Sequence, residues 1–299
     1  MKTRAITGLV MGVVFIPLII IPELLIPFQI LMIAGVVIAA LELLKMFDKD
    51  KIMGKDIKAI TVGLTLVVYL GTAWFSAKTV VSLNGHLGTK FMLGSFIAIM
   101  GSLALMIWKN DFTGSDVGKV LTTVFYVGVG FGSLVLLRLL GLRFISYLFL
   151  ITVCTDVFAY LFGVKFGKTK MAPNISPKKS WEGAITGTIV ATIIAGLFGL
   201  FYGKIFTGGM FNPNGAYDTI LTGTTLSNTN FEGVLIFVLT ILLSVVGQIG
   251  DLVASKFKRT YDVKDFGNVF PGHGGVMDRF DSAIFAATFF VLILLLLAF

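Results

Sequence analysis

The chain has 299 residues, of which 56% are hydrophobic and 13% are charged. A soluble domain has roughly 45–50% apolar and about 25% charged residues, so this composition excludes a disordered chain, a collagen-like repeat and a disulfide scaffold, and argues against a single soluble domain. The single cysteine, Cys154, cannot form an internal disulfide. In a membrane protein, the net charge of +8 favours anionic lipid headgroups or anionic substrates over nucleic acid.

Apolar runs long enough to cross a bilayer recur along the whole chain. Crossing the hydrocarbon takes about 20 apolar residues as a helix, and backbone groups in lipid must be paired within the segment. We therefore expect an all-α, polytopic integral membrane protein with about nine transmembrane helices. The first run lacks a small-residue cleavage site, so we interpret it as a retained span. The expected spans are 5–21, 28–47, 57–76, 91–108, 120–140, 144–164, 184–203, 232–252 and 278–298.

Lys and Arg residues are distributed unevenly between the two sides of these spans. With the N-terminus in the cytoplasm, 18 of the 24 fall in cytoplasmic segments and five in external ones. Cytoplasmic loops of membrane proteins carry an excess of positive charge, so the asymmetry predicts an internal N-terminus and an external C-terminus. Arg138 and Arg143 mark a very short turn between the fifth and sixth spans. The nearly uncharged stretch 205–231, rich in Gly, Asn and Thr, is interpreted as an irregular external loop.

Four acidic residues lie inside or at the ends of the expected spans, where a charge costs about 2.5–3.5 kcal/mol on insertion scales. Asp156 lies well inside the sixth span, Asp251 closes the eighth, and Asp278 and Asp281 open the ninth. Clustered carboxylates need a cation, and Mg²⁺ usually binds through one or two carboxylates together with substrate phosphates. Structural ion pairs with Lys or Arg are the alternative. Glu42, in the second span, has either a structural role or a role in assisting the site.

The two longest basic loops, 165–183 and 255–275, flank these acids. Lys and Arg beside Ser and Gly can hold phosphate oxygens, because glycine lets the backbone approach closely. Acids for a metal and bases for phosphate on one membrane face are typical of phosphoryl or nucleotidyl transfer on a nucleotide. Lys264 and His273 are candidate catalytic residues beside the acids. The candidate phosphate-binding residues are Lys178, Lys179, Ser180, Ser255, Lys258, Arg259, Gly274, Gly275 and Arg279.

An ion-coupled transporter would also place acids within the membrane. No internal repeat is evident in the chain, which weighs against the transporter folds that are built from repeats. The acids also lie toward one face, beside loops suited to phosphate. Transport is therefore the less favoured function.

The run from Ser255 to Asp281 resembles the signature of phosphatidate cytidylyltransferases, also called CDP-diacylglycerol synthases. The signature combines a Ser, Lys-Arg and Lys-Asp pairs, a Pro before His-Gly-Gly, and two Asp residues around an Arg, and every specified position fits. The segment 156–183 also resembles the family, through Asp156 and the Ser-Pro-Lys-Lys-Ser-Trp-Glu-Gly run. The resemblance covers roughly 145–299. We therefore expect N-terminal membrane helices over 1–143 and a C-terminal catalytic membrane region over 144–299.

The resemblance implies that CTP and phosphatidic acid give CDP-diacylglycerol and pyrophosphate in a reaction that requires Mg²⁺, with a second cation left open. It implies that Asp251 and Asp278 ligate the metal centre. Beside them we expect Asp156 as a further ligand and Asp281 in a supporting role. The enzyme would lie in the cytoplasmic membrane of a bacterium, with its active site facing the cytoplasm. The family is often found as a homodimer.

Two positions depart from the family pattern. Ala254 stands where the family commonly has Glu, which removes a candidate ligand oxygen, and Val157 stands where it often has Thr. A cytidylyltransferase or phosphotransferase that acts on another lipid phosphate is the alternative function. A CDP-alcohol phosphotransferase ranks low, because the chain lacks the Asp-Gly-x-x-Ala-Arg motif of that family.

Overall fold

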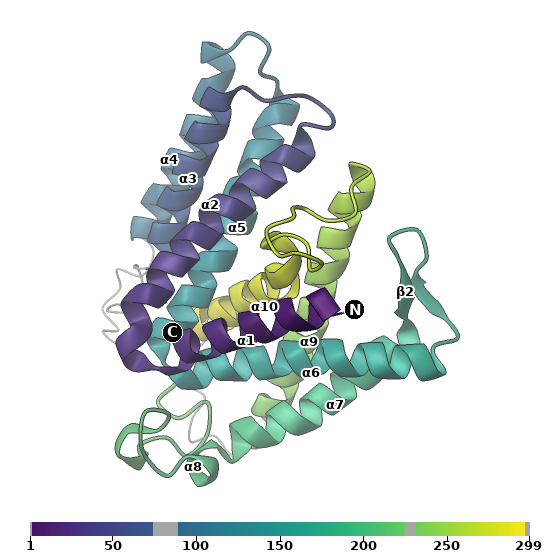
Figure 1. Cartoon of the computed structure of the whole chain (residues 1–299). Coiled ribbons are helices and arrows are strands. Elements are labelled where there is room, and N and C mark those ends of the chain that lie inside the picture. The colour runs from purple at the N-terminus through teal and green to yellow at the C-terminus, as the bar shows by residue number, and fades with distance from the viewer. Residues whose placement is uncertain (1, 74–88, 225–230, 297–299) are drawn as a thin grey trace. The chain divides into compact units, whose positions relative to one another are not determined.

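The computed structural model describes residues 2–73, 89–224 and 231–296, without the side chains of residues 2–9, 11 and 89. Helices form most of this part of the chain (Figure 1). Eight of them are long and apolar enough to cross a membrane, which confirms the all-α, polytopic fold class. They are α2 (Leu25–Phe47), α3 (Lys55–Ala73), α4 (Thr89–Trp108), α5 (Gly114–Leu140), α6 (Leu142–Phe166), α7 (Trp181–Leu200), α9 (Glu232–Thr260) and α10 (Met277–Leu296).

The predicted count of nine spans is not confirmed. The first expected span, 5–21, is a helix, α1 (Lys2–Ile20); the side chains of residues 2–9 and 11 lie outside the described residues, and α1 is not counted among the eight. The ends of the expected spans 57–76 and 278–298 lie outside the described residues, as does part of 205–231. The predicted pair at 120–140 and 144–164 is confirmed as two helices, α5 and α6. Gly141 separates them with φ of 146°, a conformation that favours glycine.

The chain divides into two compact units. The first contains residues 1–139 and 257–280, and the second contains residues 140–256 and 281–299. The first break lies close to the predicted division at 143. The segment 257–280, which holds most of the signature motif, belongs with the N-terminal helices. The assignment of catalysis to 144–299 therefore stays a prediction.

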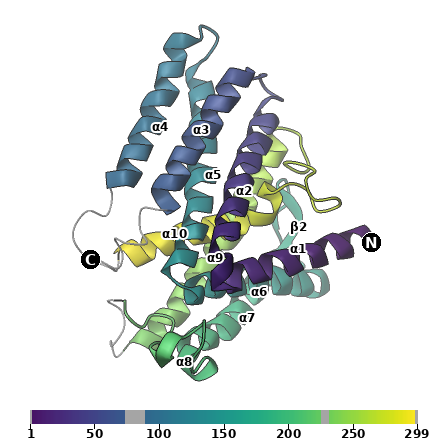
Figure 2. The ribbon, with the colours of Figure 1, turned by 60° about the vertical axis from the view of Figure 1, so that its left-hand side comes forward.

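In the first unit, α2, α3 and α4 lie alongside α5 (Figure 2). Small residues allow α5 to approach α3 closely. A Cβ atom at Gly128 would lie 2.9 Å from the carbonyl oxygen of Thr65, and one at Gly132 would lie 2.6 Å from Cβ of Thr72. Close backbone approach at small residues is the common way in which membrane helices pack. The 3-10 helix η1 (Pro22–Leu24) joins α1 to α2.

In the second unit, α6 and α7 lie side by side, and the hairpin of β1 (Lys170–Ala172) and β2 (Ser176–Ser180) stands at one end of the pair (Figure 1). A stripe of small residues along α7 makes this packing close. At Gly187 a Cβ atom would lie 2.7 Å from the carbonyl oxygen of Thr155. The stripe, which repeats every four residues, consists of Gly183, Gly187, Ala191, Ala195 and Gly199.

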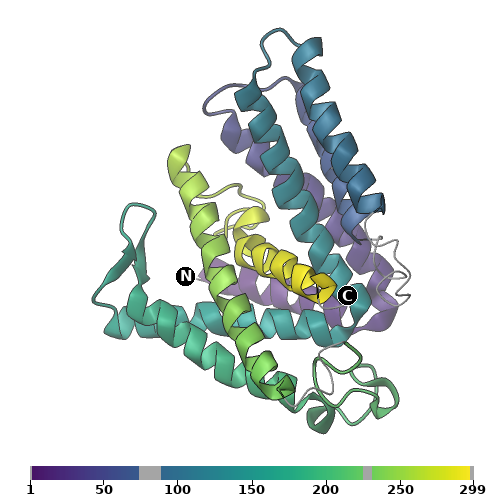
Figure 3. The same ribbon diagram turned by 180° about the vertical axis from the view of Figure 1, so that it is seen from behind.

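The helix α9 crosses α6 and α7 (Figure 3) and is joined to both by side-chain hydrogen bonds. The hydroxyl of Thr240 lies 2.6 Å from the Tyr147 hydroxyl of α6. One turn further, Ser244 bonds to Thr155 of α6 at 2.8 Å and to Thr188 of α7 at 3.1 Å. Such bonds between helices hold membrane proteins together where the hydrophobic effect does not. They orient the face of α9 that carries Asp251.

Buried side chains organise the described part of the expected irregular loop 205–231, which contains the short helix η2 (Pro213–Gly215) and follows α8 (Tyr202–Ile205). Asn212 is 1% exposed and exchanges hydrogen bonds with backbone groups of Phe206 and Tyr217. Arg143 donates to the carbonyl oxygen of Thr222 at 2.6 Å and stacks over the Tyr217 ring. Arg143 is therefore a buried anchor of this loop as well as an end-of-helix charge.

Candidate active site

The carboxylate of Asp278 lies in the first turn of α10, in the first unit, and is almost fully enclosed. Its Oδ1 lies 2.7 Å from Nζ of Lys258. Its Oδ2 accepts hydrogen bonds from the backbone N–H of Phe266 at 2.8 Å and of Gly275 at 3.0 Å. The side chain of Asp278 is 3% exposed and that of Lys258 is 12% exposed. Asp278 therefore ties three separate points of the signature motif together.

Glu42, in α2, holds the same loop from a distant part of the sequence. Its carboxylate accepts hydrogen bonds from the backbone N–H of Val276 at 3.1 Å and of Met277 at 3.0 Å. These donors lie at the start of α10, where helical N–H groups have no partner within the helix and attract negative charge. A Cβ atom at Gly267 or Gly275 would collide with the carboxylate. The absence of a side chain at Gly267 and Gly275 thus makes room for Glu42.

The Gly-rich turn before α10 is built on two glycines with left-handed backbone, Gly272 with φ of 76° and Gly274 with φ of 87°. The turn is closed by a hydrogen bond from the N–H of Phe270 to the carbonyl oxygen of Gly274 at 2.9 Å. Nδ1 of His273 is buried and has no hydrogen-bond partner among the described residues. A free ring nitrogen in such a turn suits the predicted role of His273 in binding or proton transfer, which stays a prediction.

The remaining predicted cations of the motif lie at the surface of the first unit. Lys264 and Arg279 are exposed and flank the Gly-rich turn in the sequence, and Arg259 is exposed at the end of α9. Lys264 and Arg279 face the solvent from which a phosphate would approach, whereas Lys258 is paired with Asp278. The predicted phosphate-binding role of Arg259 and Arg279 and the predicted catalytic role of Lys264 stay predictions.

A second group of predicted residues lines a pocket of about 560 Å³ in the second unit, which we call the lysine pocket. Two predicted metal ligands, Asp156 of α6 and Asp251 of α9, face this pocket together. Nζ of Lys179 lies 2.6 Å from Oδ2 of Asp251, and the two side chains are 28% and 30% exposed. The pocket is lined by Asp156, Ala159, Tyr160, Gly163, Val164, Gly167, Lys170, Lys178, Lys179, Ser180, Ala184, Gln248 and Asp251.

The hairpin positions the lysines of this pocket. Lys170 of β1 is paired with Ser180 at the end of β2, and Lys178 and Lys179 lie on β2. The hydroxyl of Ser180 accepts a hydrogen bond from the N–H of Gly183 at 3.2 Å, which caps the start of α7. Because β2 runs directly into α7, this cap fixes the lysines beside the membrane helices. The sequence indicated a basic loop here but did not indicate strands.

Ser255 and Asp281 lie close to the carboxylates of the second unit. The Ser255 hydroxyl donates to Oδ1 of Asp251 at 3.3 Å, one helical turn away on α9. Oδ1 of Asp281 accepts from the N–H of Ser282 at 2.8 Å, and the Ser282 hydroxyl lies 3.5 Å from Oδ2 of Asp156. Ser255 and Asp281 therefore lie beside the carboxylates of Asp251 and Asp156. Ala254, which stands where the family commonly has Glu, is fully buried and offers no ligand oxygen.

The predicted residues thus form two groups, one in each unit. Asp156 and Asp251 share the lysine pocket, while Asp278 belongs to the other unit, so a metal shared by Asp251 and Asp278 stays a prediction. Within the part of the chain that the structure describes, no three His, Cys, Asp or Glu side chains gather as a metal cage. One or two carboxylates completed by substrate phosphates, the usual mode of Mg²⁺, is the arrangement that this donor set fits.

Comparison with known proteins places this geometry in a family. A sequence model of the cytidylyltransferase family matches residues 2–297. The chain belongs to the cytidylyltransferase family. The predicted resemblance is confirmed, and it now extends over the N-terminal helices of this cytidylyltransferase, which the motifs alone did not cover. As a member of this family, the protein is a nucleotidyl-transferring enzyme.

The relatives of this cytidylyltransferase include three bacterial proteins named phosphatidate cytidylyltransferase. The protein from Bacillus subtilis (strain 168) is 32% identical over 99% of this chain and 98% of its own length. The protein from Staphylococcus aureus (strain COL) is 33% identical, and that from Staphylococcus haemolyticus (strain JCSC1435) is 31% identical. Both of these matches cover 95% of each chain.

Proposed function

We propose that this protein transfers the cytidylyl group of CTP to phosphatidic acid, giving CDP-diacylglycerol and pyrophosphate. The observation that carries the proposal is the similarity, over nearly the whole chain, to proteins named phosphatidate cytidylyltransferase. A phosphate oxygen of phosphatidic acid attacks the α-phosphorus of CTP. The new P–O bond forms as the bond from the α-phosphorus to the oxygen that bridges it to the β-phosphate breaks. Because the attacking phosphate is already a nucleophile, no strong base is required.

The main task of the protein is to bring two anions together. The lysine pocket supports this role, since Lys170, Lys178 and Lys179 line it and charge-assisted hydrogen bonds to phosphate offset the repulsion. Lys179 is paired with Asp251. An incoming phosphate would pair with Lys179 in place of Asp251. The Asp251 carboxylate would then be able to bind a cation, so phosphate binding would also prepare the cation site.

We propose Mg²⁺ as the cofactor, held by Asp156 and Asp251 with oxygens of the substrate phosphates. The fit is supported by the two hard carboxylates in one pocket and by the partial exposure of Asp251. When bound, the metal supplies positive charge that neutralises phosphate oxygens and stabilises the leaving pyrophosphate. Ligation by Asp278, which the family resemblance implies, would require Lys258 to leave its carboxylate.

We also propose that the active site faces the cytoplasm of a bacterium, with the N-terminus inside and the C-terminus outside. The proposal is supported by the asymmetry of Lys and Arg across the spans and by the bacterial source of the relatives. It agrees with the need of the enzyme for CTP, which is charged and does not cross a bilayer unaided. A homodimer is a further expectation from the family.

The test uses the full chain purified in detergent, with radiolabelled CTP. We expect a labelled lipid product only when phosphatidic acid and Mg²⁺ are both present, and loss of product when the metal is chelated. Product formation with a different lipid phosphate and none with phosphatidic acid would support the alternative acceptor. Absence of CTP consumption with every lipid phosphate would refute the proposal.

A further inference from the structure

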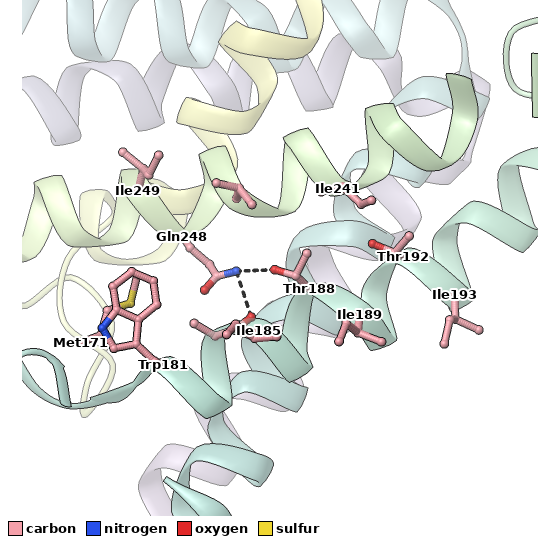
Figure 4. Close-up of a pocket in the computed structure, with 12 residues that line it drawn as sticks. Met171, Trp181, Ile185, Thr188, Ile189, Thr192, Ile193, Ile241, Gln248 and Ile249 are labelled. Carbon is pink, nitrogen blue, oxygen red and sulfur yellow. Dashed lines mark hydrogen bonds between the residues drawn. The ribbon is translucent and has the colours of Figure 1, made fainter. Parts of the chain in front are cut away.

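An apolar groove of about 440 Å³ runs between α7 and α9 in the second unit (Figure 4). Its α7 wall is a continuous stripe at positions 181, 184, 185, 188, 189, 192 and 193, which recur every three or four residues. Its α9 wall is a matching stripe. We call this feature the α7–α9 groove. Its lining residues are Met171, Trp181, Ala184, Ile185, Thr188, Ile189, Thr192, Ile193, Ile241, Val245, Gln248 and Ile249.

The groove is open, and the isoleucines of its α7 wall are only partly covered by the rest of the unit. Ile185, Ile189 and Ile193 are each about half exposed, at 55%, 53% and 52%. The opposite face of α7 carries the small-residue stripe that packs against α6. Helix α7 therefore has one face for its neighbour in the fold and a second, apolar face left for another occupant.

One end of the α7–α9 groove meets the lysine pocket. Ala184 and Gln248 line both cavities. Gln248 marks the junction, because its Nε2 donates to the Thr188 hydroxyl at 2.8 Å and to the carbonyl oxygen of Ala184 at 3.4 Å (Figure 4). Two adjacent residues show the same change from apolar to polar lining, since Trp181 lines the groove and Ser180 lines the lysine pocket. A cationic pocket is thus continuous with an apolar channel.

We propose that the α7–α9 groove binds an acyl chain of the anionic lipid substrate while the lysine pocket binds its phosphate. The inference rests on the proposed function and assigns a place to its lipid substrate. Charge complementarity selects this occupant, because a phosphate with an attached hydrocarbon chain is the ligand whose two parts match the two cavities. Both cavities fall in the range of about 300–1,000 Å³ that is common for ligand sites.

The length of the groove agrees with this occupant. From Trp181 to Ile193 the wall spans about 18 Å at the 1.5 Å rise of a helical residue. One leaflet of a bilayer has a hydrocarbon depth of roughly 15 Å, half of the usual core. The groove therefore runs over the depth that an acyl chain occupies when its headgroup lies at the membrane surface. A substrate could enter sideways from the bilayer without leaving the hydrocarbon.

The test compares two matched substitutions on α7. Ile189→Trp fills the middle of the groove, whereas Ile194→Trp adds the same bulk at a part-exposed isoleucine that does not line it. KM is measured for dioleoyl and for dihexanoyl phosphatidic acid. We expect Ile189→Trp to raise the ratio of the two KM values about tenfold, as steric changes in apolar sites do, and Ile194→Trp to leave it unchanged. An unchanged ratio in Ile189→Trp would overturn the proposal.

A second measurement uses the unaltered protein and does not depend on how a variant folds. Phosphatidic acid with a photoreactive group on its acyl chain is crosslinked, and the labelled peptides are mapped. We expect labels within 185–193 and 241–249, competed by excess phosphatidic acid and not by phosphatidylcholine. The proposal would be overturned by labels confined to other segments or by competition from any lipid. It would also be overturned if a second copy of the chain covered the groove. Failure of the proposed function is distinct, because the unaltered protein would then turn over neither lipid.

Discussion

At the scale of single residues, Asp278 has a structural role in the motif and a predicted role as a metal ligand. Its carboxylate is paired with Lys258 and bonded to two backbone N–H groups, so three of its acceptor positions are in use. The predicted role as a metal ligand uses the same oxygens. Either role requires a full negative charge at this position, and an amide of the same shape cannot supply it.

We predict that Asp278→Asn lowers turnover by about a hundredfold or more, the scale seen when a group that stabilises transition-state charge is removed. The protein should still elute as a folded species on gel filtration in detergent. CDP-diacylglycerol formation is the readout. The control is Asp262→Asn, an exposed acid of the same loop with φ of 50°, a conformation that asparagine tolerates. Near-normal activity in Asp278→Asn would remove Asp278 from the site.

Glu42 leads to a second prediction, because two N–H donors face its two carboxylate oxygens. In Glu42→Gln one of these donors would face an NH₂ group, and a buried donor left unpaired costs about 1–3 kcal/mol. We expect a lower thermal midpoint and a kcat reduced about tenfold, because the loop that Glu42 holds also holds Asp278. The control is Glu23→Gln, an exposed glutamate of η1. Equal behaviour of the two variants would show that Glu42 does not position the loop.

Part of this site could be predicted from the sequence and part could not. The signature motif identified Lys258, Gly275 and Asp278, because their spacing within one short segment is readable. The role of Glu42 was not readable, since its partners lie more than 230 residues away. The one available signal was the cost of an acid inside an apolar run, which indicates a specific partner without naming it.

At the scale of elements, α7 has two faces with different tasks. One carries the small residues that pack against α6, and the other carries the isoleucines of the α7–α9 groove. The sequence predicted an apolar span here but not this division, because both faces are apolar. The β1–β2 hairpin was missed for another reason: its strands contain Lys, Ser and Pro and lack an alternating apolar pattern.

The close contact of α6 and α7 gives a third prediction. In Gly187→Ala, the new Cβ would lie 2.7 Å from the carbonyl oxygen of Thr155 and 2.8 Å from Cβ of Ala159. Backbone cannot yield as a flexible side chain would, so we expect a loss of about 1–3 kcal/mol in the free energy of unfolding. Unfolding in mixed detergent and SDS measures it.

The matched control for this substitution is Gly63→Ala, inside α3, where a Cβ atom would meet nothing within 4 Å. Replacing glycine by alanine at a compatible position stabilises a protein by about 0.4–1 kcal/mol. Gly63→Ala should therefore be neutral or stabilising. A loss in Gly63→Ala as large as that in Gly187→Ala would mean that helix crowding is not the cause.

At the scale of the whole molecule, the signature motif is one segment of sequence that contributes to two units. The chain passes from the second unit to the first after Lys256 and returns after Phe280. The motif therefore links the unit that holds Asp156 and Asp251 to the unit that holds Asp278. Spacing along a sequence does not carry this information, so the resemblance indicated one catalytic region where the structure has two compact units.

The number of membrane crossings gives the last prediction, and α1 decides it. Among the described residues, eight helices are long and apolar enough to cross a membrane; the side chains of residues 2–9 and 11 lie outside the described residues, so α1 is not counted with them. If only the eight cross, both ends of the chain lie on the same side, whereas nine crossings place them on opposite sides. The charge asymmetry favours nine, because it puts Lys2 and Arg4 with the cytoplasmic loops.

Reporters that fluoresce only in the cytoplasm, fused before Met1 or after Phe299, distinguish these cases. We expect signal from the N-terminal fusion and none from the C-terminal one, with a reporter active only outside giving the reverse. Signal from both cytoplasmic fusions would mean that α1 lies along the membrane surface. A third reporter, placed between Pro173 and Asn174, determines the side of the lysine pocket. This position lies in the turn of the hairpin that carries Lys178 and Lys179. Because CTP is made available in the cytoplasm, an external signal at that turn would contradict the proposed site.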